Sequence, residues 1–212
     1  MDLAIRNAQV VTSSGIFTCD VGIADGRIVQ LGTVGPAATE FDARGLILTP
    51  GGVDTHCHLD EVMPGMGYEA ENFGSGGRSA LAGGTTSCIS FIRQIPGHTL
   101  ADVVAETFRR AERSRIDYSF HATITDPTSE ILDEVPSVLA QGIRSLKVFL
   151  TYDTSRLNDG AFIRVLAEAR RGGAMTAVHC ENYHAIGWLT EKLLEAGLTA
   201  PKYHAWSRPK VV

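Results

Sequence analysis

The sequence lacks the features that mark several classes of protein. None of its 4 cysteines stands in a CxxC pair, which predicts reduced thiols and no disulfide framework. No run approaches the roughly 18 apolar residues of a membrane span, and the start from Met1 to Arg6 has no basic and apolar leader. Lysine and arginine are scattered and the net charge is -5, which argues against nucleic acid as a partner. We therefore expect a cytoplasmic protein that binds neither membranes nor nucleic acid.

Residues 1–49 are rich in short β-branched runs and predict the N-terminal part of a β-sandwich, or a meander. Longer runs at 3–12, 16–24 and 27–32 are separated by Ser13-Ser14-Gly15 and by Asp25-Gly26, a pair typical of hairpin turns. Shorter strands are expected at 39–41 and 46–48.

From residue 50 to 212, predicted strands alternate with predicted helices, which is typical of a parallel sheet covered by helices. The strands are expected at 52–56, 85–91, 118–123, 145–150 and 175–179. Helices are expected at 100–113, 130–141, 161–171 and 183–196. Asp159 is the expected N-cap of the helix at 161–171, and Pro136 is expected to interrupt the helix at 130–141 and start a second helical turn. Five such units are too few for a closed eight-stranded barrel, which usually needs about 250 residues. An open sheet and an unclosed barrel both remain possible.

His56 and His58 end the first of these strands and lie two residues apart. On an extended strand both imidazoles point to the same face, so they could bind one metal ion. The carboxyl ends of strands are where α/β barrels build their active sites. The pattern alone is weak, because two histidines at this spacing are common.

Lys147 and His179 occupy similar places on later strands. Lys147 lies within an apolar strand, where an unpaired ammonium is costly to bury. It could snorkel or pair with a carboxylate; alternatively, its amine could react with carbon dioxide to give an anionic carbamate that bridges two metals. His179 alone would more often be a core histidine than a ligand. Together with the pair, however, the three positions predict one metal site.

Five segments, in this order, resemble the hydantoinases and dihydropyrimidinases, a family of cyclic amidohydrolases. They are PGGVDTHCHLD at 50–60, AGGTT at 82–86, LKVFLTY at 146–152, VHCEN at 178–182 and YHAWSRP at 203–209. The resemblance covers nearly the whole chain, and the motifs are highly specific in combination.

This resemblance implies a (β/α)8 TIM-type barrel, of which about five βα units are present, beside a small β-sandwich. It implies two divalent metal ions, expected to be Zn²⁺, bridged by a hydroxide and by Lys147 carboxylated by CO2. His56 and His58 would bind one metal and His179 the other, while Tyr152 would donate a hydrogen bond to the developing oxyanion. Tyr152 could also simply cover the mouth of the barrel. The expected partners are a small cyclic amide and, by the resemblance, further copies of the chain in a homotetramer.

Two parts of the family pattern are missing: a second histidine for the other metal, and an aspartate that binds metal and shuttles a proton. Both would lie beyond Val212, so the chain is expected to be truncated on its C-terminal side. By itself it is expected to be incomplete and inactive as a catalyst. The loop after His58 also departs from the family, and Met63, Met66 and Tyr68 are candidate substrate-pocket residues, although a plain surface loop is as good an account.

The leading hypothesis is an enzyme that opens a hydantoin or dihydropyrimidine ring to an N-carbamoyl amino acid. An allantoinase-like ureide hydrolase is an alternative within the same class. A non-catalytic scaffold, like the collapsin response mediator proteins, is an alternative of another class. Those scaffolds have lost metal ligands, whereas this chain holds all the ligands that its length can contain.

Overall fold

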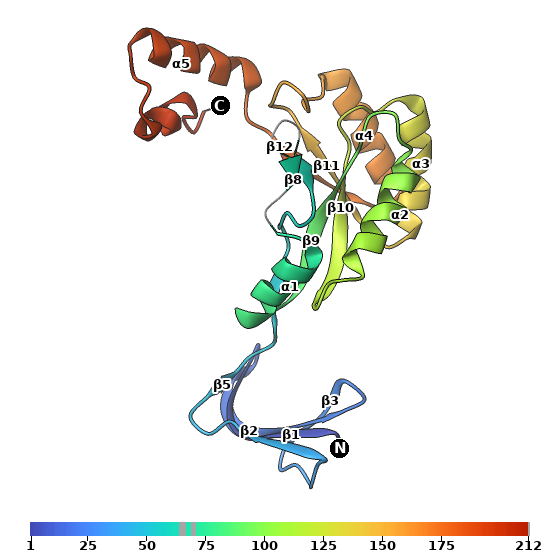
Figure 1. The fold of residues 1–212 in the computed structure, drawn as a ribbon, viewed down its shortest axis with the longest axis vertical. Coiled ribbons are helices and arrows are strands. Elements are labelled where there is room, and N and C mark those ends of the chain that lie inside the picture. The colour runs from blue at the N-terminus through green and yellow to red at the C-terminus, as the bar shows by residue number, and fades with distance from the viewer. Residues whose placement is uncertain (64–66, 69–70, 212) are drawn as a thin grey trace. The chain divides into compact units, whose positions relative to one another are not determined.

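The structure, a computed structural model, describes residues 1–63, 67–68 and 71–211. The chain forms two compact units, residues 1–52 and residues 53–212, and each contains its own five-stranded sheet (Figure 1). Assignment of these units to the predicted sandwich and barrel domains, with a boundary at residue 49, stays a prediction.

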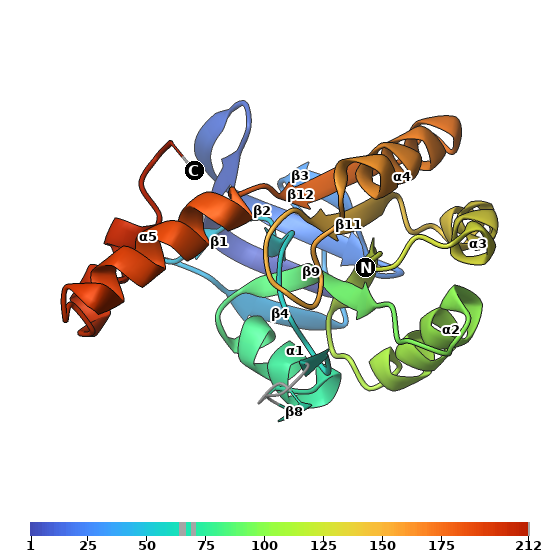
Figure 2. The ribbon, with the colours of Figure 1, turned by 90° about the horizontal axis from the view of Figure 1, so that it is seen from above.

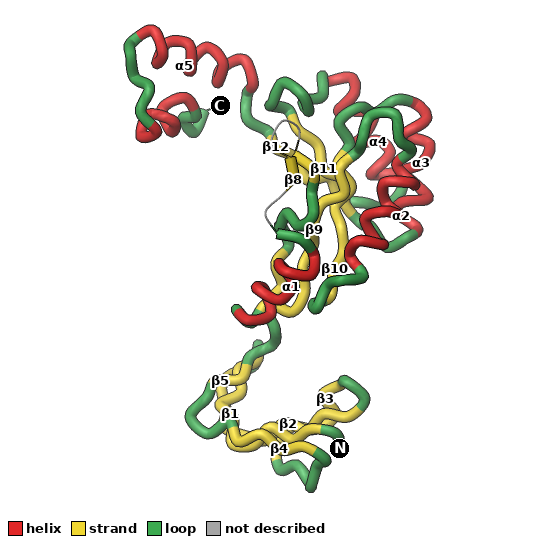
Figure 3. Tube along the Cα trace, viewed as in Figure 1, coloured by secondary structure: helices red, strands yellow, loops and turns green. Residues whose placement is uncertain are grey.

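The first unit is a mixed sheet with the strand order β3-β2-β1-β4 (Figure 3). Its first three strands, β1 (Leu3–Thr12), β2 (Gly15–Ala24) and β3 (Arg27–Gly32), pair antiparallel as a meander. Asp25 and Gly26 form the second turn, both with positive φ. The meander then ends, because β4 (Thr39–Asp42) and β5 (Ile47–Leu48) both pair in parallel with β1.

The second unit contains the sheet that positions the candidate site. Its order is β12-β11-β10-β9-β6, and the pairings from β9 to β12 are parallel. The strands are β6 (Gly52–Asp54), β9 (Thr85–Arg93), β10 (Asp117–Thr123), β11 (Ser145–Phe149) and β12 (Met175–His179). β7 (Val62–Met63) and β8 (Gly67–Tyr68) form a separate antiparallel pair. Five strands in chain order, four of them paired in parallel, form the curled sheet expected for part of a barrel.

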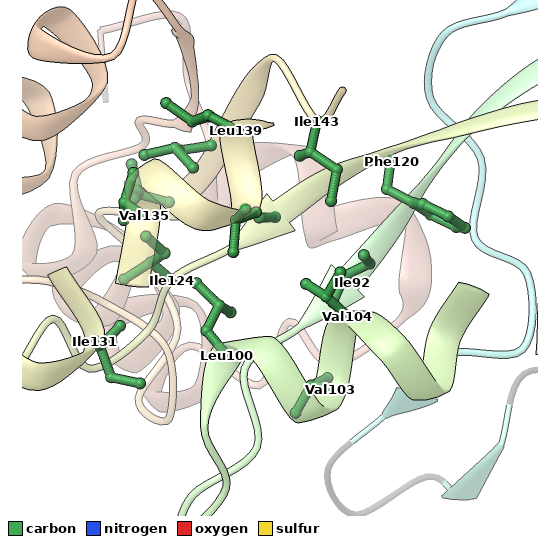
Figure 4. Packing of buried hydrophobic residues seen from close by; sticks show 14 of the residues in the cluster. Ile92, Leu100, Val103, Val104, Phe120, Ile124, Ile131, Val135, Leu139 and Ile143 are labelled. Atoms are coloured by element: carbon green, nitrogen blue, oxygen red, sulfur yellow. The ribbon is translucent and has the colours of Figure 1, made fainter. Parts of the chain in front are cut away.

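Helices cover one face of this sheet. α2 (Leu100–Ala111), α3 (Ser129–Ala140) and α4 (Asp159–Arg171) lie side by side against it (Figures 1 and 2). Their apolar faces and the strands form one core, which includes Leu100, Val104, Phe120 and Leu139 (Figure 4). α5 (Tyr183–Glu195) packs against the 3-10 helix η1 (Pro201–Ser207). No helix of the described residues is both long and apolar enough to cross a membrane.

Two predicted helix details were wrong. Asn158, not Asp159, caps α4, because its side chain accepts a hydrogen bond from the Ala161 N–H at 2.9 Å. α3 runs through Pro136 without a break, since the burial of its apolar face against the sheet outweighs the missing backbone donor.

The sequence did not predict α1 (Phe73–Ala82), which lies in a glycine-rich segment that resembles a loop. Asn72 and Ser75 form a capping box at its start. A Cβ on Gly77 would lie only 3.1 Å from the backbone nitrogen of Arg115, so glycine permits close packing of this helix.

Candidate functional site

His56 and His58 lie just beyond β6, which ends two residues earlier than predicted. The Asp54 carboxylate accepts the His56 N–H at 3.0 Å, and the Cys57 N–H donates to the Ile89 carbonyl at 3.2 Å, so this segment continues along β9. The two imidazole centroids are 5.4 Å apart, and each ring packs on Phe91. The pair therefore lies at the carboxyl end of the sheet, with both rings on the same side.

Lys147 is in the middle of β11 and is only 7% exposed. Its Nζ lies 4.9 Å from the ring centroid of Phe149 and 5.8 Å from that of Phe91. In the part of the chain that the structure describes, this amine has no hydrogen bond and no ion pair. Burial lowers the pKa of Lys147, because a charged ammonium is poorly solvated there. The same amine lowers the pKa of His56, after the larger effect of that ring's own burial.

His179 is the last residue of β12, and Tyr152 lies in the turn that follows β11. The Tyr152 hydroxyl is 3.4 Å from Nε2 of His179, and Glu181 Oε2 is 2.6 Å from the same nitrogen. Tyr152 adopts a positive φ of 70°, which is uncommon for a bulky residue and turns its ring back towards the strand ends. The rings of Tyr152 and His179 meet edge to face with centroids 4.9 Å apart.

A single cavity of about 490 Å³ brings these residues together. The four predicted ligands and Tyr152 all line it. Sequence reasoning missed its further polar lining, Glu61, Arg93, Thr123, Thr154 and Ser155. Arg93 and Thr123 are the last residues of β9 and β10, so the strand-end rule that found the histidines could also have found them.

The predicted pocket residues Met63, Met66 and Tyr68 cannot be placed in this cavity, because Met66 and the side chains of Met63 and Tyr68 lie outside the described residues. His121, given no ligand role from sequence, is buried. It bonds to the Ser145 hydroxyl and, at 2.9 Å, to the Thr55 carbonyl. This bond secures the backbone next to His56.

A metal centre needs several donor side chains that converge on one point, commonly with an anionic ligand among them. Within residues 1–63, 67–68 and 71–211, no three His, Cys, Asp or Glu side chains are grouped to hold a metal ion. The four predicted ligands in the cavity are three imidazoles and one amine, so none of them is anionic until Lys147 is modified. A neutral, desolvated amine is the form of lysine that reacts with carbon dioxide, and the carbamate formed is anionic. The residues present therefore fit a metal centre that depends on modification of Lys147.

Comparison with known proteins gives close matches over both units. A D-hydantoinase from Rhizobium radiobacter is 39% identical over 212 residues, which is 99% of this chain and 46% of that protein. The chain is a homologue of the hydantoinases and dihydropyrimidinases. It spans about half the length of the curated relatives that it matches.

Solved structures agree with the sequence matches. One described as D-hydantoinase matches with a TM-score of 0.92 and 39% identity, covering 99% of this chain and 46% of that one. A dihydropyrimidinase from Brevibacillus agri matches with a TM-score of 0.89 and 37% identity, over the same shares of both chains. These matches confirm the predicted fold class, part of a TIM-type barrel with an N-terminal β-rich portion.

The first unit has a match of its own. Residues 1–52 fit the family described as urease alpha-subunit, N-terminal domain. This range coincides with the first compact unit.

Proposed function

We propose that this chain carries the metal-binding strands of a hydrolase that opens a cyclic amide, a hydantoin or dihydropyrimidine ring, to an N-carbamoyl amino acid. The observation that carries the proposal is the cavity lined jointly by three histidines, a desolvated lysine and Tyr152 at the carboxyl ends of the strands. The names of the homologues, D-hydantoinase and dihydropyrimidinase, support this choice of substrate class.

His56 and His58 would hold one divalent ion, expected to be Zn²⁺, and His179 the second. Lys147 would join the two after its amine nitrogen forms a bond to the carbon of CO2 and releases one proton, which leaves an anionic carbamate. When bound, the two ions lower the pKa of water and polarise the amide carbonyl of the substrate.

Tyr152 would act on the reacting carbonyl. Its hydroxyl lies beside His179, so it can donate a hydrogen bond where negative charge develops on the carbonyl oxygen. Removal of one such donor typically costs about 100- to 1,000-fold in kcat. Tyr152→Phe should therefore lower kcat by that factor and leave metal content unchanged.

The carbamate can be tested without an assay of activity. The chain is prepared with zinc and ¹³C-bicarbonate, and its ¹³C spectrum and metal content are measured. We expect one carbamate signal in the wild type. The Lys147→Met variant should lose this signal and most of the bound zinc. The control Lys202→Met, which changes a surface lysine, should retain both. A wild type that holds no zinc and no carbamate would overturn the proposal and favour the scaffold alternative.

Ring opening is then measured with zinc-loaded full-length protein, prepared with bicarbonate, on hydantoins, dihydropyrimidines and allantoin. We expect activity on the first two, and the Lys147→Met variant should lose it. Activity on allantoin alone would replace the proposed substrate with a ureide.

The expected homotetramer and the expected cytoplasmic location remain predictions. Light scattering, which measures molar mass in solution, tests the homotetramer.

A further inference from the structure

Glu61 is a buried carboxylate on the wall of the same cavity, and sequence reasoning gave it no role. Its side chain is only 3% exposed, although it follows His58 by three residues at the start of a loop. A carboxylate at this depth is costly to bury unless it is paired and hydrogen-bonded. The partners of Glu61 therefore indicate why the residue is there.

The closest partner is His58. Its Nδ1 lies 2.5 Å from Glu61 Oε2, and because an ionised carboxylate can only accept, this geometry favours a hydrogen bond donated by Nδ1–H. The His58 ring also stacks on Phe91, with centroids 4.6 Å apart and 11° between the planes. Stacking sets the plane of the imidazole, and the hydrogen bond sets its rotation within that plane. With the proton on Nδ1, the lone pair of the ring is on Nε2.

Two residues from other segments of the chain hold Glu61 in place, Arg93 directly and Ser155 through Arg93. Arg93, the last residue of β9, lies 3.5 Å from Glu61 Oε1 and donates to Ser155 Oγ at 2.8 Å. Ser155 is buried in the turn after β11, where its N–H donates to the Tyr152 carbonyl at 3.2 Å. The chain of contacts thus ties the loop after β6 to the turn that carries Tyr152.

We propose that Glu61 is a positioning residue, which holds His58 as the Nδ1–H tautomer and directs its Nε2 lone pair to a metal ion. Arg93 and Ser155 keep the carboxylate in that position. The inference rests on the proposed metal centre, and it assigns Glu61 an action through His58 and not on the substrate. Partners of this kind on ligating histidines typically change metal affinity by about 10- to 100-fold.

The tautomer of His58 is the first test, and it needs no metal. The ¹⁵N spectrum of histidine-labelled, metal-free chain is recorded, with His58 assigned by the signals lost in His58→Asn. We expect the Nδ1–H tautomer in the wild type and a mixture of tautomers in Glu61→Met, which removes the acceptor. Glu61→Gln keeps a carbonyl acceptor and should retain most of the wild-type preference.

Zinc affinity, measured by competition with a chelating dye in the presence of bicarbonate, is the second test. Glu61→Met should bind zinc about 10- to 100-fold more weakly, and Glu61→Gln should recover part of that loss. Glu168→Gln is the matched control, because it alters a carboxylate paired with Arg171 on α4, and its affinity should equal that of the wild type. If Glu61→Met does not fold by circular dichroism, Arg93→Gln replaces it, with an affinity expected between those of Glu61→Met and the wild type.

Both readouts have to change for the inference to stand. An unchanged tautomer, or an unchanged zinc affinity, in Glu61→Met would reduce Glu61 to a structural ion pair with Arg93 and leave the proposed function intact. A wild type that binds no zinc would overturn the proposed function, and the inference with it.

Discussion

Residues 1–52 and residues 53–212 each form a five-stranded sheet, but they bury their apolar side chains to different extents. The buried cluster of the first unit consists of Ala8, Val10, Val21 and Ala43. Several of its other apolar side chains are more than half exposed, namely Ile16, Ile28, Val29, Leu31 and Ile47. In the second unit, three helices lie on the sheet and enclose a large core. Strand-forming patterns are therefore alike in the two units, while burial depends on what covers the sheet.

Polar contacts are correspondingly more important in the first unit. The Arg6 guanidinium pairs with the Asp20 carboxylate, at 3.0 Å between Nη1 and Oδ2, and with the Glu40 carboxylate. It also donates hydrogen bonds to the backbone carbonyls of Val34 and Gly35, the latter at 2.9 Å. These bonds connect β1, β2, β4 and the loop before β4. One guanidinium thus joins segments that share few buried apolar contacts.

The largest expected effect is in the core of the second unit. Phe120 is 1% exposed and packs edge to face against Phe73 and Phe108, with centroids 6.0 and 5.0 Å away. Phe120→Ala should lower the free energy of unfolding by about 3–5 kcal/mol, because it removes transfer energy and leaves a cavity. Ile28→Ala, at a side chain 67% exposed, should change it by less than about 0.5 kcal/mol. Urea denaturation measures both, and equal losses would contradict the comparison.

A smaller effect, of opposite sign, is expected at Pro136. This exposed residue lacks the N–H that would bond within α3, and its ring crowds the preceding turn. Pro136→Ala should raise the free energy of unfolding by about 1–3 kcal/mol, the scale of the proline penalty in a helix interior. Thermal unfolding provides the measurement. A lower Tm in the variant than in the wild type would show that Pro136 stabilises the folded protein.

The smallest effect is the response of the first unit to acid. The Asn7 N–H, and then Arg6, lower the pKa of Asp20 below its ordinary value of 3.8. The folded state thus favours the ionised carboxylate, and this contribution is present above pH 3.8 and lost as the pH falls through the lowered pKa. The hydrogen-exchange protection factors of residues 1–52, which are corrected for the intrinsic pH dependence of exchange, should fall below that pH in the wild type, and less steeply in Asp20→Asn. Identical pH profiles in the wild type and in Asp20→Asn would show that Asp20 does not contribute to the acid sensitivity of the first unit.

Most of the strands could be predicted, because short apolar runs bounded by turn residues are local signals. β1, β3 and β12 have the predicted bounds, and β2 and β10 differ by one residue. α1 could not be predicted in this way, since its glycines suggest a loop until the close approach to Arg115 is known. The unbroken α3 was missed for a related reason: the apolar contacts that keep it helical at Pro136 come from distant residues.

The candidate site shows the same division. The residue types and the strand-end positions of His56, His58, Lys147 and His179 were evident in the sequence, and the cavity that they share is consistent with the prediction of a joint site. Glu61 could not be selected, because nothing in a loop sequence indicates that a glutamate will be buried 2.5 Å from a particular nitrogen.

The sequence by itself determined the alternation of strands and helices and the family to which the chain is homologous, since both depend on local patterns and on motif order. Only the tertiary structure decided which polar side chains meet at the strand ends, and that Lys147 is buried among aromatic rings without an acidic partner in the described residues. It also decided that Glu61, Arg93 and Ser155 join three segments around His58. The physical reason is that burial and charge pairing depend on residues brought together from distant parts of the chain, whereas strand and helix signals depend on neighbours in sequence.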